Sequence, residues 1–216
     1  MTGPEDDSQL GLALGGPVDG GQRTLVAPGG GVPGALVAGV DEVGRGPLAG
    51  PVAAAAVVFA EPDAVAGLTD SKKLSAKRRR ELHDAILAQA HAAGLGWAEA
   101  EEIDGVNVGQ ATHRAMERAV AALGTSPAEV RIDGNSRPAG LAEARCIVGG
   151  DGTDPAISAA SIVAKVIRDD WMVAYDARYP GYGFARHKGY GTAEHRQAIK
   201  QLGPSPIHRR SFTIKS

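Results

Sequence analysis

The sequence predicts an α/β fold in which helices flank a mixed β-sheet. Short apolar runs typical of strands come early in the chain, and helix-length segments then alternate with further short strands. This order of elements favours helices packed on a sheet of mixed direction. The hydrophobic fraction of the 216-residue chain is 43%, which is enough for a globular core.

The expected strands are short apolar runs that end at polar or glycine-rich turns. They cover 36–40, 52–60, 94–101, 129–133 and 144–148. The second run is apolar throughout, which is typical of a strand buried on both faces of its sheet.

The expected helices carry small apolar residues at helical spacing. They cover 76–93, 107–123, 154 to about 179, and 192–202. Ser75 is a residue type that caps a helix N-terminus, and Gly124 is one that ends a helix. Ala156, Ala159 and Ala160 belong to a small-residue stripe that permits close packing of the long helix.

The two ends of the chain differ from its middle. Residues 1–35 hold ten Gly and four Pro with little periodicity, which favours a flexible tail. Residues 36–180 are expected to form the main domain, and 181–216 a basic C-terminal extension packed on it. The net charge is only −2, but basic residues gather at 72–80 and in the extension. Such clusters suit a polyanion, with solvated helix faces as the alternative.

Composition also indicates the compartment. A single cysteine, Cys146, excludes an intramolecular disulfide framework and fits a reducing environment. The longest apolar run, 52–60, is too short to span a membrane, and the acidic N-terminus argues against a secretory signal. We therefore expect a cytoplasmic protein, and a monomer because every amphipathic face is assigned to the core.

Four acidic residues occupy similar places in the predicted sheet. Asp41 ends the first strand with Glu42 beside it, and Asp133 and Asp151 follow two later strands. Strand ends meet at one edge of an α/β sheet, where the carboxylates would repel one another without a cation. Oxygen ligands favour Mg²⁺ or Mn²⁺, and two ions roughly 4 Å apart suit phosphoryl displacement. For any single acid, a role as a turn former is the alternative.

Five motifs around these acids resemble ribonuclease HII of the bacterial type. They are DEVGRGP at 41–47, DSKKL at 70–74, IDGN at 132–135, ISAASIVAKVIRD at 157–169 and YGFxxHKGYGT at 182–192. The resemblance runs from about Val37 to Phe212 and leaves the N-terminal tail outside. It implies a ribonuclease H-like catalytic domain over 36–180 with a C-terminal helical extension.

The resemblance also implies an activity and a set of site residues. The activity is a metal-dependent endoribonuclease that hydrolyses the RNA strand of RNA–DNA hybrids. It also cuts 5′ to single ribonucleotides in duplex DNA, leaving 3′-hydroxyl and 5′-phosphate ends, as in ribonucleotide excision repair. The implied catalytic residues and metal ligands are Asp41, Glu42, Asp133 and Asp151. The implied substrate contacts are Gly44, Arg45 and Gly46 at the ribose 2′-hydroxyl, Tyr190 stacked on the next sugar, and Lys72, Lys73, His187 and Lys188 at phosphates.

Three other interpretations explain part of the sequence. Ribonuclease HIII shares the chemistry but would carry a substantial N-terminal substrate-binding domain. A non-catalytic duplex binder would have lost one or more of the four carboxylates. A Mg²⁺-dependent DNA junction nuclease explains the acids but not Arg45 between its glycines, or Tyr190.

A second motif lies inside the expected tail. The hexapeptide from Gln9 to Leu14, Gln-Leu-Gly-Leu-Ala-Leu, resembles the short peptides with which bacterial proteins dock on the replication sliding clamp. A linear motif on a flexible tether gains effective concentration without a fold of its own. We therefore expect the sliding clamp as a partner, beside the nucleic-acid substrate.

Overall fold

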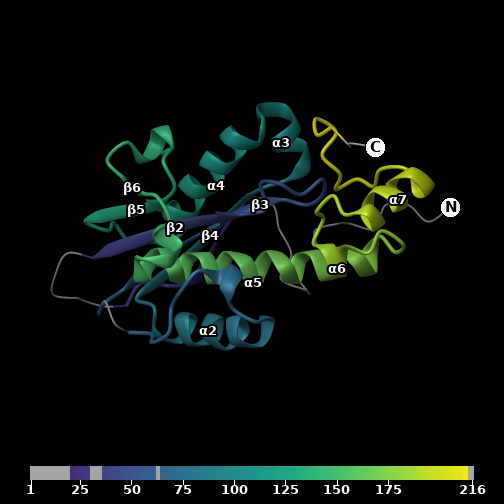
Figure 1. Ribbon diagram of the computed structural model, residues 1–216. Coiled ribbons are helices and arrows are strands. Elements are labelled where there is room, and N and C mark those ends of the chain that lie inside the picture. Colours follow the sequence, from purple (N-terminus) through teal and green to yellow (C-terminus); the bar gives the residue numbers. More distant parts are fainter. Residues whose placement is uncertain (1–19, 30–35, 62–63, 214–216) are drawn as a thin grey trace.

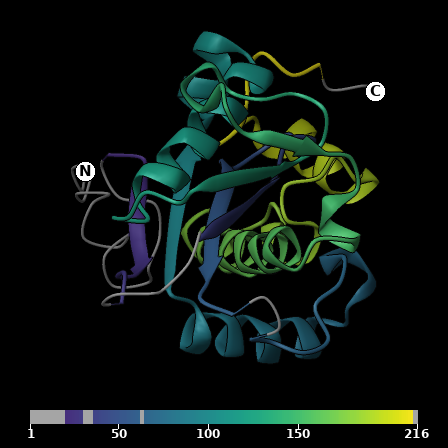
Figure 2. The same ribbon diagram turned by 90° about the vertical axis from the view of Figure 1, so that its left-hand side faces the viewer.

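A six-stranded mixed sheet forms the centre of the computed structural model, which describes residues 20–29, 36–61 and 64–213. Helices cover both faces of this sheet (Figure 1; Figure 2). The spatial order of the strands is β1-β4-β3-β2-β5-β6. Strands β1, β4, β3 and β2 pair antiparallel, whereas β5 runs parallel to β2, and β6 parallel to β5. The predicted α/β fold with a mixed sheet is confirmed.

The elements alternate along the chain much as the sequence predicted. The strands are β1 Gln22–Val26, β2 Val37–Val43, β3 Val52–Phe59, β4 Ala92–Ala98, β5 Glu129–Asp133 and β6 Arg145–Ile147. The helices are α2 Ala76–Gln89, α3 Ala100–Val106, α4 Val108–Ala121, α5 Pro155–Arg178, α6 Phe184–His187 and α7 Ala193–Leu202. Short 3₁₀ turns are η1 Ser71–Lys73, η2 Ala139–Leu141 and η3 Gly150–Gly152.

Strand β3 lies at the middle of two apolar cores because all eight of its residues are buried. Successive side chains of a strand point to opposite faces. Ala54 and Ala56 therefore share one core with α4, while Ala53 and Ala55 share the other with α2 and α5. In Figure 1, α3 and α4 lie on one side of the sheet, and α2 and the long α5 lie on the other.

The boundary between α2 and β4 differs from the prediction. Helix α2 ends at Gln89 rather than at 93, and β4 covers 92–98 rather than 94–101. Ala92 and Ala93 are fully buried and pair with Val58 and Val57 of β3. Alanine favours a helix by propensity alone, but this pairing and burial in the sheet override it.

Part of the expected flexible tail belongs to the sheet. Residues 22–26 form β1, which pairs with β4 from Gln22 opposite Gly96 to Val26 opposite Ala93. The Thr24 hydroxyl also donates a hydrogen bond of 2.7 Å to the carbonyl of Ala122. The prediction of a flexible segment is therefore wrong for this stretch, because β4 offers it an edge for pairing. The clamp-like motif at 9–14 lies outside the described residues.

A third apolar cluster joins the C-terminal segment to the end of α5. It includes Met172 of α5, Phe184 of α6, Ala198 of α7 and Ile207 beyond it. Figure 1 shows α6 and α7 at the C-terminal end of α5. Among the residues that the structure describes, no helix combines the length and the apolar character needed to cross a membrane.

Candidate active site

Three of the four predicted acids come together at one end of the sheet. Asp41 lies in β2, Asp133 ends β5, and Asp151 lies in η3. Each offers a carboxylate oxygen, and these oxygens lie within 4.8 Å of one another. Parallel pairing of β2 with β5 places Val40 opposite Ile132, so the acids that follow them are neighbours. This cluster could hold a metal ion, because divalent cations such as Mg²⁺ prefer oxygen ligands.

Asp41 is the most deeply buried acid of the cluster, with 5% of its surface exposed. Burial raises its pKa well above the usual range, and the charges of Glu42 and Asp133 raise it further. A hydrogen bond from the Ser161 side chain and one of 2.7 Å from the Glu42 backbone N–H lower the pKa and orient the carboxylate. A cation beside Asp41 would offset both the burial and the repulsion.

Backbone and hydroxyl groups fix the other two members. The Gly150 backbone N–H donates to Asp133 Oδ1 at 2.7 Å, which ties η3 to the end of β5. The Ser158 hydroxyl of α5 donates to the Asp151 carbonyl at 2.6 Å. Sequence reasoning did not single out Ser158 or Ser161, which it counted within the motif on the long helix.

Glu42 lies beside this cluster rather than within it. Its Oε1 is 3.5 Å from Arg45 Nη1. Burial raises the Glu42 pKa, Arg45 lowers it, and the charge of Asp133 raises it again. Neighbouring side chains of a strand point to opposite faces, yet the charge of Glu42 raises the pKa of Asp41, so the two carboxylates still interact.

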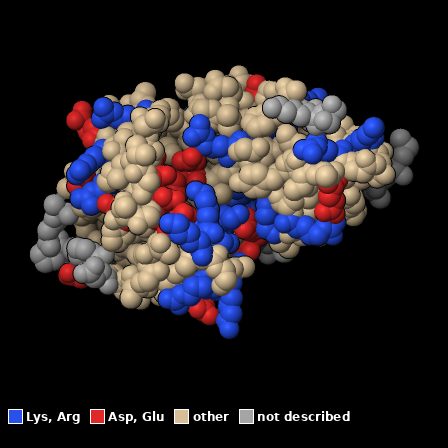
Figure 3. Space-filling model, viewed as in Figure 1, with Lys and Arg blue, Asp and Glu red and all other residues tan. Residues whose placement is uncertain are grey.

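The turn η1 presents basic residues to the acids. Lys72 Nζ lies 3.5 Å from Asp151 Oδ2, and both Lys72 and Lys73 are exposed. Ser71 beneath them is hydrogen-bonded to Ser161 at 2.9 Å between hydroxyl oxygens. Figure 3 shows acidic side chains in the middle of one face with a band of Lys and Arg side chains next to them. This arrangement suits a polyanion that meets both the acids and the band.

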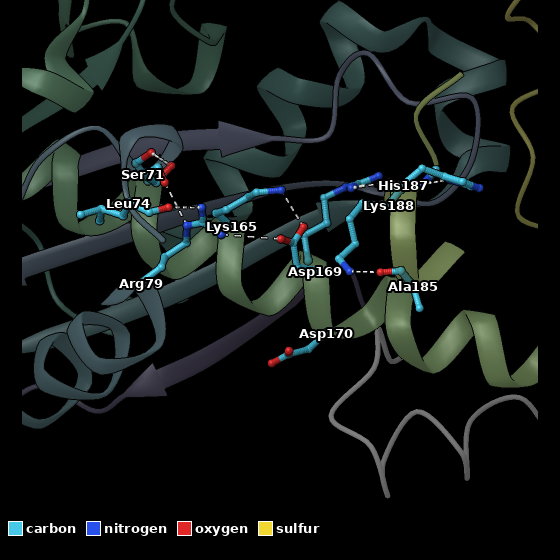
Figure 4. A network of polar contacts seen from close by, with 12 residues as sticks. Ser71, Leu74, Arg79, Lys165, Asp169, Asp170, Ala185, His187 and Lys188 are labelled. Carbon is cyan, nitrogen blue, oxygen red and sulfur yellow. Dashed lines mark hydrogen bonds and ion pairs between the residues drawn. The ribbon is translucent and has the colours of Figure 1, made fainter. Parts of the chain in front are cut away.

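A half-buried network on α2 and α5 supports η1 (Figure 4). Arg79 donates hydrogen bonds of 2.9 Å each to the carbonyls of Ser71 and Leu74. Asp169 lies 3.9 Å from Arg79 and accepts a 2.7 Å hydrogen bond from Lys165 Nζ. These contacts give Asp169 a structural role beneath η1, and they direct Lys165 to an ion pair.

The Gly-Arg-Gly turn and Tyr190 lie side by side at the surface. Gly44 has φ +91°, and a Cβ there would lie 2.1 Å from Arg168 Nε, so the position requires glycine. Arg45 and Gly46 are exposed, as is Tyr190 at 43%. A Cβ on Gly46 would be 3.7 Å from the Tyr190 ring, which shows how close the two elements are.

His187 and Lys188, which precede Tyr190, contact residues of their own segment. His187 is buried, with Nε2 2.8 Å from the Tyr182 carbonyl, and its Nδ1 accepts from the Gly189 N–H at 3.2 Å. A phosphate contact by His187, as the resemblance implied, does not agree with these contacts. Lys188 is half-buried, with its amino group donating to the Ala185 carbonyl.

Comparison with known proteins shows the family of this chain. The sequence model of the family Ribonuclease HII matches residues 38–215. A ribonuclease HII of Halorhodospira halophila is 58% identical over 179 residues, which cover 82% of this chain and 91% of the relative. The ribonuclease H2 of Pyrococcus horikoshii OT3 superposes with a TM-score of 0.70 at 28% identity, covering 83% of this chain and 94% of that one. The PCNA:RNase HII complex from Archaeoglobus fulgidus gives a TM-score of 0.72 at 23% identity, covering 84% and 96%.

The mixed sheet, the helical C-terminal part and the converging carboxylates define a nuclease of the ribonuclease H-like class. Within this class, the chain belongs to the ribonuclease HII family. It is therefore a hydrolase and an endonuclease of the ribonuclease H type. The expected family and fold are confirmed, and family membership decides against ribonuclease HIII and the junction nuclease.

Proposed function

We propose that this protein hydrolyses the RNA strand of RNA–DNA hybrids and cuts 5′ to single ribonucleotides in duplex DNA. The products would carry 3′-hydroxyl and 5′-phosphate ends. One observation carries the proposal: three carboxylates within 4.8 Å of one another lie in the same chain as a Gly-Arg-Gly turn whose exposed residues, Arg45 and Gly46, border Tyr190. The carboxylates supply a place for hydrolysis, and the turn with its tyrosine supplies a place to examine a sugar.

Asp41, Glu42, Asp133 and Asp151 are the residues proposed to hold Mg²⁺ or Mn²⁺, with two ions in the site. Carboxylate oxygens fit these hard cations. Burial raises the pKa values of Asp41 and Glu42, so a cation beside them would favour their ionised forms. The bound ions would supply an activated water and stabilise the leaving 3′ oxygen. The chain itself orients the acids through Ser161 and the backbone of η3.

The exposed turn is proposed to distinguish RNA from DNA. The backbone of Gly44, Arg45 and Gly46 would meet the ribose 2′-hydroxyl, the group that separates the two sugars. Tyr190 would stack on the following sugar. Lys72 and Lys73 would contact phosphates beside Asp151, and Lys188 is a weaker candidate for the same role.

The proposal is tested with a labelled DNA duplex that contains one internal ribonucleotide. We expect cutting at the 5′ side of that ribonucleotide, with products that can be extended by a polymerase because their 3′ ends carry a hydroxyl. An all-DNA duplex of the same sequence should stay intact. Cutting of the all-DNA duplex, or cutting 3′ to the ribonucleotide, would sink the proposal. Tight binding without any cutting would favour the non-catalytic duplex binder.

A partner is proposed on separate grounds. The motif from Gln9 to Leu14 would dock on a replication sliding clamp, and the related fold of the Archaeoglobus fulgidus protein was solved in a PCNA complex. A peptide covering residues 5–18 should bind the bacterial clamp, and a peptide with Leu12 and Leu14 changed to Ala should not. No binding of the unchanged peptide at high micromolar concentration would remove this partner. A monomer, a cytoplasmic location and the division at residues 180 and 181 also stay predictions.

A further inference from the structure

We infer that Arg168 and Arg209 are positioning residues that hold the Gly-Arg-Gly turn and the Tyr190 loop in one fixed arrangement. The Tyr190 loop is the segment 188–192 between α6 and α7. The inference rests on the proposed function of these two elements as the reader of the ribonucleotide. Among the described residues, the side chains of both arginines donate their hydrogen bonds to backbone carbonyls and not to the carboxylates of the cluster. Both donate to backbone carbonyls of the segment 44–51, which contains the turn.

Arg209, which follows α7 in the C-terminal segment, holds the turn by hydrogen bonds. It is 3% exposed although it lies only seven residues from the end of the chain. Its guanidinium donates to the carbonyls of Gly50 at 3.0 Å from Nε, Arg45 at 2.8 Å from Nη1, and Gly44 at 2.5 Å from Nη2. Two of these three acceptors belong to the turn itself, so the position of the turn depends on Arg209.

Arg168 joins the same segment to the tyrosine loop. It is fully buried on α5 and donates to the carbonyls of Pro51 at 2.9 Å, Ala49 at 3.3 Å and Lys188 at 3.0 Å. The first two acceptors end the segment that carries the turn, and the third lies two residues before Tyr190. One guanidinium therefore sets the spacing between the two parts of the proposed reader.

Backbone hydrogen bonds place these segments side by side. The Leu48 N–H donates to the Gly189 carbonyl at 2.8 Å, and the Gly50 N–H donates to the Ile207 carbonyl at 2.9 Å. The Arg209 N–H returns a bond of 2.9 Å to Leu48. The segment 44–51 thus lies between the Tyr190 loop and the C-terminal segment. Hydrogen bonds of Arg168 join it to the first, and those of Arg209 join it to the second.

A chain of histidines fixes Tyr190 to the same C-terminal segment. The Ser205 N–H donates to His208 Nδ1 at 2.8 Å, so His208 carries its proton on Nε2. His208 can then donate to His195 Nε2 at 3.0 Å, and His195 Nδ1 donates to the Tyr190 carbonyl at 2.9 Å. Burial lowers the pKa of both histidines, which keeps them in these neutral forms at pH 7.

Two buried guanidiniums beside one another are unfavourable by themselves. Burial lowers the pKa of Arg168 to about 10, and burial with the charge of Arg168 lowers that of Arg209 to about 9. Hydrogen bonds offset part of this cost, because a planar guanidinium can meet three carbonyls at once. Lysine keeps the charge but cannot present donors in this planar fork.

The test compares two substrates in each variant, because a folding defect lowers activity on both to the same extent. The measured quantity is the ratio of kcat/KM on a single-ribonucleotide duplex to kcat/KM on a uniform RNA–DNA hybrid. The uniform hybrid offers a 2′-hydroxyl at every position, so it depends less on coupling between the turn and Tyr190. We expect Arg209→Gln to lower the ratio about tenfold, which corresponds to about 1.4 kcal/mol.

Arg210→Gln is the matched control because Arg210 is the neighbour of Arg209 and is exposed, whereas Arg209 is buried. The control should keep the wild-type ratio. Arg209→Lys retains the charge and decides the question if Arg209→Gln does not fold. A ratio within twofold of wild type in a folded Arg209 variant would overturn the inference. Failure of the wild-type protein to cut the single-ribonucleotide duplex would instead overturn the proposed function, and the inference with it.

Discussion

Asp41 combines a negative charge with a nearly complete loss of solvent. The strand that carries it pairs with β3 on one side and with β5 on the other, and its carboxylate meets the Ser161 side chain of α5, which packs on the sheet. Its raised pKa means that the folded protein binds a proton more readily than the unfolded chain does. Stability from this group is therefore lost as pH rises from the unfolded pKa towards the folded one. The ionised Asp41 carboxylate therefore lowers the stability of the folded protein at neutral pH.

Replacing Asp41 by Asn removes this cost and removes a proposed metal ligand. In chelator at pH 7 we expect a higher Tm for Asp41→Asn than for wild type, because burial and the neighbouring charges disfavour the ionised form of Asp41. Each 1 kcal/mol of stability gained corresponds to about 2–4 °C in Tm for a chain of this size. The difference should shrink as pH falls, and cleavage should drop at least about 10²-fold. A variant less stable than wild type at neutral pH would contradict this account of Asp41.

Protons and metal ions should compete at the site. The pKa values of Asp41 and Glu42 are both raised, chiefly by burial, so metal binding must displace protons from them. We expect the Mg²⁺ concentration for half-maximal cleavage to increase as pH falls from 8 to 6. A Mg²⁺ requirement that stays constant over this range would show that the buried acids do not titrate with metal binding.

The meeting of the acidic residues could be predicted from the sequence, whereas the burial of Arg168 and Arg209 could not. Asp41, Asp133 and Asp151 each follow an apolar run in the sequence, so their meeting at one end of the sheet could be expected, although β2 continues past Asp41 to Val43. Arg168 gave no such signal, because an arginine on a helix is most often solvated and only tertiary packing encloses this one.

At the scale of elements, glycines in β4 permit a helix to approach the sheet closely. A Cβ on Gly96 would lie 2.1 Å from the carbonyl oxygen of Ala115 in α4, and one on Gly94 would lie 2.2 Å from that of Ala119. The alanine-lined face of α4 was predicted from its spacing. Its contact with glycines of β4 depends on the pairing of distant strands, which spacing does not reveal.

Gly96→Ala should therefore separate α4 from the sheet and destabilise the protein by about 1–3 kcal/mol. Gly105→Ala is a matched control, because Gly105 lies in α3 with open space around it and alanine favours helix by about 0.5–1 kcal/mol. Denaturant unfolding measures both changes. Equal stability of the two variants would argue against close packing of α4 on β4.

At the scale of the whole molecule, the C-terminal segment completes a surface that begins near residue 44. Arg209 donates to the carbonyls of Arg45 and Gly44 in the turn, which lie 164 and 165 residues before it in the chain. The basic character of this segment suggested contact with nucleic acid, but Arg209 is buried and serves the fold. A charge count treats buried and exposed arginines alike, so only the structure could separate them.

The central claim is that the converging carboxylates perform metal-dependent cleavage at a ribonucleotide. The most direct measurement is the rate of cleavage of a single-ribonucleotide duplex by wild type and by Asp133→Asn, each with Mg²⁺ and with chelator. Both proteins must first show the same circular dichroism spectrum, so that a loss of activity reflects the site. The account predicts cutting by wild type with Mg²⁺ alone. Unchanged cutting by Asp133→Asn, or cutting in chelator, would contradict it.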